Sequence, residues 1–389
     1  MKDGMLDFSD TLYITEKAHK LLWKSEVHPY DILLSMSGTV GRVAIASPDY
    51  HYPMNSNQDI AKIHLREEYN PYYVYAFLRS RYGQNYLRRE ACGSVQQHVF
   101  LSQFERLEIP FPSQSLQTRI ADVVSLGYQK QAKAQKHFHA ATSILVQELG
   151  LDVQKPSTKQ ISVRSFREIF QTGRIDAEYY QPKYDAILQQ LARISDGTIG
   201  TRCSIYDQNF TPDAATTYRY IELADIGNQG IITGCTTDTG DNLPTRARRI
   251  VHTGNLLVPS IEGSLQSMAL VSDAYDGALC STGFFVLDAD DINSETLLVL
   301  FKSAPMQALL KRQCAGTILT GFNKDALCSI PLPVIPLDVQ KQIQASVRQS
   351  FELRAQAVTL LATARRAVEC FIEQGEAAAL AVLASDSEA

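Results

Sequence analysis

The chain has 389 residues, of which 45% are hydrophobic and 20% charged, and its formal net charge is −5. This length exceeds the usual size of one domain, so we expect at least two packed cores, and the composition excludes a disordered or fibrous protein. The longest apolar stretch, 377–384, is too short to span a membrane and no signal pattern is present, so we expect a cytoplasmic protein.

The distribution of charge bears on nucleic-acid binding. Residues 115–159 carry six basic and three acidic side chains, and the other segments are neutral to acidic. Because non-specific affinity for DNA comes from neutralising phosphates, a DNA-binding protein with this charge needs a partner that supplies part of the positive field. The seven cysteines form no C-x-x-C pair, which favours reduced thiols over zinc sites or disulfides.

An internal repeat recurs at a spacing of about 221 to 226 residues and decides the architecture. Residues 30–46 match residues 254–271, and each stretch has two apolar runs around a glycine-bearing turn. This pattern predicts two β-hairpins. Residues 70–94 match residues 293–317, and both predict amphipathic helices that begin at an asparagine cap.

The repeat continues into two long helices. Residues 107–120 match residues 328–343, where a strand ends in Pro-x-Pro and a helix with a Gln-x-x-Ile start follows. These helices, about 115–149 and 338–375, have a heptad-like apolar seam and predict an antiparallel coiled coil. The alternative is that each helix packs only on its own domain. The predicted seam residues are Leu116, Ile120, Val123, Phe138, Leu145, Val339, Ile343, Val347, Phe351, Val358 and Leu361.

Motifs for catalysis are missing from the sequence. It contains no phosphate-binding loop, no H-E-x-x-H and no glycine-rich dinucleotide motif. The N-P-Y-Y at 70–73 lacks the second proline of amino-methyltransferases, so Asn70 is predicted to cap a helix. The G-T-V-G at 38–41 joins two strand-like runs and predicts a hairpin turn instead of an RNA-binding clamp. We therefore predict a protein that is not an enzyme, with no metal site and no catalytic residue.

Three stretches together resemble the specificity subunit of type I restriction-modification systems. They are GSVQQHVFLSQFERLEIPFPSQSLQTRI (93–120), GTILTGFNKDALCSIPLPVIPLDVQKQI (316–343) and GRIDAEYYQPKYDAIL (173–188). The resemblance implies an α+β protein with two tandem α/β target-recognition domains, separated by the helix pair. Each domain would recognise one half of a bipartite asymmetric site in double-stranded DNA.

The resemblance also implies partners. The helix pair would dock DNA adenine methyltransferase subunits, two in the expected complex, and a translocating restriction subunit would complete a phage-defence system. S-adenosylmethionine would bind in the methyltransferase, and this chain would hold no cofactor.

The repeat and the resemblance together predict the domain limits. They are a first recognition domain (1–114), a first spacer helix and linker (115–159), a second recognition domain (160–337), a second spacer helix (338–376) and a flexible tail (377–389). Gly4 aligns with Gly230, so residues 160–229 have no counterpart before the first repeat. We expect the first domain to be shortened, either by truncation or in a form that a partner or second copy completes.

Candidate DNA contacts are the polar loop residues whose side chains can bond base edges. In the first domain they are Thr39, Arg42, Asn55, Asn57, Gln58, Ser94, Gln96, Gln97 and His98. In the second domain they are Glu262, Ser264, Gln266, Thr282, Thr317, Thr320, Asn323 and Lys324, with Arg246, Arg248 and Arg249 as phosphate contacts. For any one of them, an ordinary solvated loop residue is an equal alternative.

Two other functions remain open at this point. One is a protein-interaction scaffold with duplicated modules that never binds DNA, and salt-sensitive DNA binding would separate it from the specificity subunit. The other is a self-contained restriction-modification enzyme, which the missing cofactor-binding loop disfavours.

Overall fold

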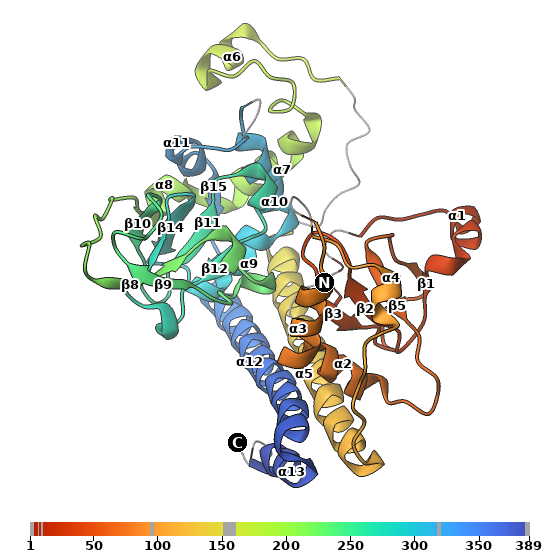
Figure 1. The fold of residues 1–389 in the computed structure, drawn as a ribbon. Helices are drawn as coiled ribbons and strands as arrows, with labels where there is room; N and C mark the ends of the chain where they lie inside the picture. Colours follow the sequence, from red (N-terminus) through yellow and green to blue (C-terminus); the bar gives the residue numbers. More distant parts are fainter. Residues whose placement is uncertain are drawn as a thin grey trace. The chain divides into compact units, whose positions relative to one another are not determined.

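The computed structural model describes residues 4–6, 8, 11–93, 97–150, 161–316 and 320–385. The chain divides into two compact units, Met1–Ala134 with Glu352–Ala389, and Gln135–Phe351. The division passes through both long helices, α5 (Gln114–Glu148) and α12 (Leu337–Gln374), so each unit holds one part of each helix. Figure 1 shows the fold of each unit.

The first unit contains a small antiparallel sheet flanked by helices. Its strands are β1 (Glu26–Val27), β2 (Ile32–Ser35), β3 (Val43–Ile45), β4 (Met54–Asn55) and β5 (Ile60–Ile63). Its helices are α1 (Glu16–Leu21), α2 (Pro71–Arg79), α3 (Arg81–Glu90), α4 (Leu101–Phe104) and α13 (Glu376–Ser385), with parts of α5 and α12. Strand β2 pairs antiparallel with β3 and with β5, and β1 pairs antiparallel with β4.

The second unit has larger sheets. Its strands are β6 (Ser195–Thr198), β7 (Cys203–Tyr206), β8 (Thr217–Ile221), β9 (Thr236–Thr239), β10 (Ala247–Ile250), β11 (Leu256–Pro259), β12 (Ala269–Leu270), β13 (Leu279–Ser281), β14 (Phe284–Ala289) and β15 (Pro331–Pro333). Its own helices are α6 (Phe166–Thr172), α7 (Pro182–Ile194), α8 (Ile199–Arg202), α9 (Ser294–Lys302), α10 (Ala304–Gln313) and α11 (Lys324–Cys328). The strand orders are β10-β13-β8-β9, β12-β11-β14-β7 and β15-β6.

The two units repeat the same elements, as the sequence predicted. The pairing of β2 with β3 and β5 recurs as the pairing of β11 with β12 and β14, which confirms both hairpins. Each hairpin precedes a helix pair, α2–α3 or α9–α10, that begins at an asparagine. Asn70 Oδ1 accepts from the Tyr72 backbone N–H at 3.0 Å, and Asn293 Oδ1 accepts from Thr296 at 2.9 Å. Asn70 is therefore the predicted helix cap.

The long helices pack against each other within both units, and this confirms the coiled coil. In the first unit, Leu116 and Ile120 of α5 share a buried cluster with Leu361 of α12. Gly127 permits the close approach there, because a Cβ at this position would lie 3.1 Å from the Leu361 side chain. In the second unit, the later part of α5 shares a cluster with the earlier part of α12, through Phe138, Leu145, Val339, Ile343 and Val347.

One predicted seam residue is wrong. Val358 is 57% exposed, whereas its neighbour Ala357 is buried. Successive helical residues are rotated by about 100°, so the face that carries Ala357 and Leu361 turns Val358 toward solvent. Val123 and Phe351 lie at the rim of the two clusters, half-buried.

The repeated glutamine that follows each Pro-x-Pro segment has a packing role in the second unit. The Gln340 side chain donates to the Asp291 and Ile335 carbonyls at 2.8 and 3.0 Å, and it accepts from the Asn293 backbone N–H at 2.9 Å. It therefore ties the start of α12 to the start of α9. In the first unit, Gln117 donates to the Pro112 carbonyl at 3.0 Å.

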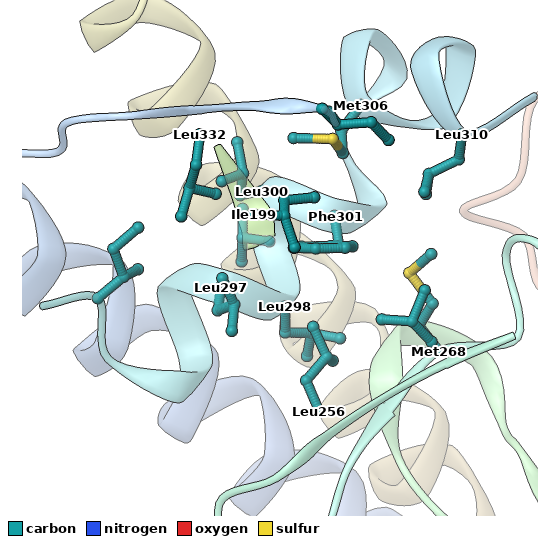
Figure 2. Close-up of a cluster of buried hydrophobic side chains, with 14 of the residues drawn as sticks. Ile199, Leu256, Met268, Leu297, Leu298, Leu300, Phe301, Met306, Leu310 and Leu332 are labelled. Carbon is teal, nitrogen blue, oxygen red and sulfur yellow. The ribbon is translucent and has the colours of Figure 1, made fainter. Parts of the chain in front are cut away.

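Helices α9 and α10 cover the hydrophobic core of the second unit. Figure 2 shows Leu297, Leu298 and Phe301 of α9 among Leu256, Met268, Met306 and Leu310. Arg174 fastens the segment before α7 to the end of α10, because its guanidinium donates to the Gln313 and Cys314 carbonyls at 3.0 and 2.8 Å. This accounts for the R-x-D of the 173–188 stretch, since Asp176 pairs with the same arginine at 2.7 Å.

The end of the chain differs from its prediction as a flexible tail over 377–389. Helix α13 occupies Glu376–Ser385, and its Ala379 and Leu383 side chains are buried in the core of the first unit. The alanine-rich composition gives high helix propensity, and the apolar contacts supply the burial that a free tail lacks.

Candidate nucleic-acid interface

Three loops of the first unit meet at the backbone of Met36. The Met36 N–H donates to the Asp59 carbonyl at 2.7 Å, and its carbonyl accepts from the Val99 N–H at 2.9 Å. Ser37 also forms a bridge with His98. The hairpin turn after β2, the turn before β5 and the segment after α3 are therefore held side by side. We call this arrangement the loop junction.

The second unit has the same loop junction at Ser260. The Ser260 N–H donates to the Gly283 carbonyl at 2.9 Å, and its carbonyl accepts from the Phe322 N–H at 3.0 Å. Ile261 forms a bridge with Gly321, as Ser37 does with His98. Gly321 is needed for this approach, because a Cβ there would lie 2.5 Å from the Ser260 carbonyl oxygen.

The hairpin turn of the first junction presents Thr39 and Arg42, both of which are exposed. The turn is shaped by Ser35, whose hydroxyl accepts from the Arg42 backbone N–H at 2.9 Å and donates to the Thr39 carbonyl at 2.5 Å. Gly38 and Gly41 supply the positive φ angles that the turn requires, 70° and 88°. The turn is thus fixed by backbone bonds, and the two predicted side chains point away from the core.

The second loop of the first junction contains two residues with local roles. Asn55 donates to the Leu22 carbonyl at 3.1 Å and to the Ser25 hydroxyl at 2.9 Å, so its amide holds the segment after α1. Asn57 accepts from the Asp59 backbone N–H at 3.2 Å and shapes a turn. Gln58 is exposed beside it.

The third loop of the first junction follows α3. Cys92 and His98 exchange two backbone hydrogen bonds, at 2.8 and 2.9 Å, and these close the loop between them. Gln97 is exposed and His98 is half-buried. Ser94 and Gln96, also predicted, lie outside the described residues, as does Thr317 in the equivalent loop of the second unit.

Several side chains at the second junction bond to one another. Glu262 accepts from the Thr320 hydroxyl at 2.6 Å and lies 3.5 Å from the Lys311 ammonium. Its charge is therefore compensated within the unit. Ser264 is half-buried and Gln266 is exposed. The Thr282 backbone N–H donates to the Arg246 carbonyl at 2.9 Å, which places β10 beside this loop.

Asn323 and Lys324 have structural partners. Asn323 caps α11 through its side-chain oxygen, which accepts from the Ala326 N–H at 2.9 Å. The Lys324 ammonium lies 2.8 Å from Asp207 Oδ2. This hydrogen bond lowers the pKa of the Asp207 carboxyl and raises the pKa of Lys324.

The three predicted phosphate contacts at the start of β10 and within it separate into two groups. Arg246 is exposed, and Arg248 is half-buried with its Nε donating to the Thr245 carbonyl at 3.0 Å. Arg249 donates to the Phe284 carbonyl and lies 5.8 Å over the Phe285 ring. Arg249 is therefore held by contacts within the unit, whereas Arg246 is exposed.

Cavities lie away from both junctions. The first unit has one of about 430 Å³ lined by Tyr82, Tyr86, Arg89 and Leu107 among others, and the second has one of about 290 Å³ beside Arg202 and Asp291. In the described part of the chain, no helix is long and apolar enough to cross a membrane. The same residues contain no group of three or more His, Cys, Asp or Glu side chains that could hold a metal ion.

None of the DNA contacts predicted from the sequence lies in the segment around α1. Lys17, Lys20 and Lys24 are exposed there, next to Trp23, the only tryptophan of the chain. A cluster of basic and apolar residues was visible in the sequence, but its six-residue helix gives no periodicity that would single it out.

Comparison with known proteins gives a family match within the first unit and similar solved structures over most of the chain. Residues 14–134 match the family model of the type I restriction modification DNA specificity domain. No curated protein matches the chain.

Three solved structures are similar to the chain over most of its length. The S subunit of the type I restriction-modification system from M. genitalium is 13% identical, with 92% of this chain and 82% of that chain covered and a TM-score of 0.33. The HsdS subunit from Thermoanaerobacter tengcongensis is 15% identical, with 90% and 81% covered and a TM-score of 0.30. A third structure, from work on complex assembly and conformational transition of the type I R-M system, is 14% identical. It has 93% of this chain and 82% of that chain covered, with a TM-score of 0.31. Because these TM-scores are low, only the match of residues 14–134 bears on the family of the chain.

Proposed function

We propose that the chain is a DNA specificity subunit of a type I restriction-modification system, since residues 14–134 match the model of that DNA specificity domain. Its two units would each recognise one half of a bipartite, asymmetric DNA site. The observation that supports this is the loop junction, which occurs once in each unit at Met36 and Ser260 with the same backbone hydrogen bonds. Repeated backbone with different side chains is what two half-site readers on one chain require.

The chemistry of the exposed side chains fits base recognition. Thr39, Arg42 and Gln97 at the first junction, and Gln266 at the second, are exposed. Arginine bonds guanine, glutamine bonds adenine and threonine bonds either, and a good bidentate pair contributes about 1–3 kcal/mol of discrimination. Asn55, Asn323 and Glu262 have partners within the chain and contribute by holding the loops.

Catalysis belongs to partner subunits in this proposal. The paired parts of α5 and α12 dock adenine methyltransferase subunits, two per chain, and these bind S-adenosylmethionine. A translocating restriction subunit joins the same complex, and the complex acts in the bacterial cytoplasm, where the DNA is. A DNA-binding partner also explains how a chain of net charge −5 can act on a polyanion.

A base-resolution methylome of the source cell, with the gene intact and deleted, tests the proposal. Deletion is expected to abolish adenine methylation at one split, asymmetric motif, while other marks persist. Restoring the intact gene should restore that motif. A methylome that deletion leaves unchanged would contradict the proposal.

A further inference from the structure

The segment around α1 in the first unit exposes an unusual number of large apolar side chains. We call residues 11–25 the α1 arm. Tyr13 is 95% exposed, Leu21 73% and Trp23 65%, and Leu12, Ile14 and Leu22 are exposed as well. Figure 1 shows α1 at the edge of its unit, beside β1. Exposed apolar groups gathered in one segment mark a surface that binds something.

The α1 arm is held in one shape by its base. Asn55 donates to the Leu22 carbonyl and the Ser25 hydroxyl, and His19 Nδ1 lies 2.7 Å from Asn55 Oδ1. The Lys62 ammonium donates to the Lys24 carbonyl at 3.3 Å. At the other end, Thr15 caps α1 by accepting from the Ala18 N–H at 3.2 Å. The apolar side chains are therefore presented by a fixed backbone, so little ordering cost remains for binding.

The charge of the α1 arm points to a polyanion. Lys17, Lys20 and Lys24 are exposed, and Glu16 is the only acidic residue within 11–25. The chain as a whole is acidic, with a net charge of −5. A locally basic segment on an acidic protein complements phosphates better than it complements an average protein surface.

The second unit places positive charge at the same position of the repeat. Glu26 of β1 lies opposite Asn55, and Ile250 of β10 lies opposite Leu279, so the two strand pairs correspond. Lys24 and Arg248 each precede the corresponding residue by two positions. Two units with different side chains thus carry a cation at one equivalent place of the repeat.

We propose that the α1 arm is a duplex-DNA contact of the first unit, in which its lysines bind phosphates and Trp23, with Leu21 and Leu22, packs against a base step or sugar edge in a groove. This inference rests on the proposed function. Apolar side chains inserted beside basic ones are a common way to hold and bend duplex DNA. The apolar side chains add affinity that does not depend on salt, and the lysines add the salt-dependent part.

The single tryptophan provides a direct test. The full chain, labelled with 5-fluorotryptophan and assembled with unlabelled methyltransferase, gives one fluorine resonance, from Trp23. The ligand is a duplex that carries the motif found in the methylome. The resonance is expected to shift, and to become protected from solvent, when the duplex is added to the complex.

Each other result of this titration overturns the inference. If the duplex binds by fluorescence anisotropy and the resonance stays unchanged, the α1 arm is not a DNA contact, while the proposed function stands. If the resonance moves when methyltransferase is added and not further with DNA, the α1 arm is a protein interface. If the complex binds no duplex, the proposed function fails and the inference fails with it.

Variants separate the two parts of the contact. Replacing Lys17, Lys20 and Lys24 by glutamine is expected to reduce the slope of log K against log salt by about one per lysine. Trp23→Ala is expected to weaken binding on the order of tenfold without changing that slope. Lys183→Gln and Val163→Ala, exposed in the second unit outside its loop junction and outside the long helices, are the matched controls and should change neither quantity. A triple variant with the wild-type slope would contradict the lysine contacts.

Discussion

The two loop junctions share a backbone and differ in what their side chains do. At Met36 the side chains of the hairpin turn are exposed, whereas at Ser260 Glu262 is bonded to Thr320 and paired with Lys311. The surrounding sheets differ too: β14 has β7 on one side, and β5 is an edge strand in the described part of its sheet. A duplicated backbone can therefore keep one loop geometry while its side chains diverge, as the proposed recognition of two different half-sites requires.

The largest effect is expected from a double variant that disrupts the buried clusters of both units. Ile120→Asp combined with Ile343→Asp puts a carboxylate into each of the two buried clusters, where both isoleucines are fully buried. An unpaired buried charge costs on the order of 3–5 kcal/mol, so the variant should unfold at lower denaturant and lose its methyltransferase in co-purification. Val163→Asp, at an 89% exposed position outside the long helices, is the control and should assemble normally. Normal assembly of the double variant would contradict the role of the helix pair.

A smaller effect separates the two junctions. Gly321→Val puts side-chain atoms within 2.5 Å of the Ser260 carbonyl, so the second junction must open. Overpacking of this kind costs about 1–3 kcal/mol, and we expect recognition to be lost or relaxed in one half of the methylated motif. Gly234→Val, where a Cβ would lie 3.6 Å from its nearest neighbour, Asp225 Oδ1, should be tolerated. Sequencing of methylated DNA from cells with each variant checks both, and an unchanged motif for Gly321→Val would count against the junction.

Two residues in the second unit distinguish a side chain that stabilises a loop from one proposed to contact DNA bases. Asn323→Ala removes the cap of α11 and should lower the free energy of unfolding by about 1 kcal/mol, without altering the motif. Gln266→Ala, at an exposed position, should leave the unfolding midpoint unchanged and relax the motif. Denaturant titration and methylome sequencing of both variants provide the readouts. The opposite pattern would reverse the two assignments.

The smallest expected effect is a pH dependence. The Lys324 hydrogen bond lowers the pKa of Asp207, so the pair stabilises the folded state above the ordinary carboxyl pKa, about 3.9. That contribution is lost as the pH falls through the lowered pKa of the folded state. Asp207→Asn should therefore be slightly less stable than the wild type near neutral pH, and equal to it at acid pH. Thermal unfolding across this range measures the difference, and a constant gap at all pH values would contradict the pairing.

Local patterns in the sequence predicted much of the fold. The asparagine caps at Asn70 and Asn293 and the glycine-bearing hairpin turns depend on neighbours a few residues away, so their signals are complete within a short window. The repeat then doubled each signal. The predicted limits of the long helices, 115–149 and 338–375, lie within one residue of the observed ends.

Long-range contacts explain what sequence reasoning could not provide. Asn55 resembled a base-reading residue because its partners, Leu22 and Ser25, lie 33 and 30 positions away. Arg249 is the third arginine within 246–249, but it donates to the carbonyl of Phe284, 35 positions away. Helix α13 is stabilised by a core that no local pattern reveals. The predicted DNA contacts themselves stay predictions, and the junctions show only which loops lie together.

The most direct test of the central claim compares half-site variants in one experiment. Cells would express the chain with Thr39→Ala and Arg42→Ala at the first junction, or with Gln266→Ala and Thr282→Ala at the second, and their methylomes would be read at base resolution. We predict that each pair of substitutions changes the recognised bases in one half of the motif only, and that the two pairs affect opposite halves. Changes in the same half, or in both halves for either pair, would contradict it.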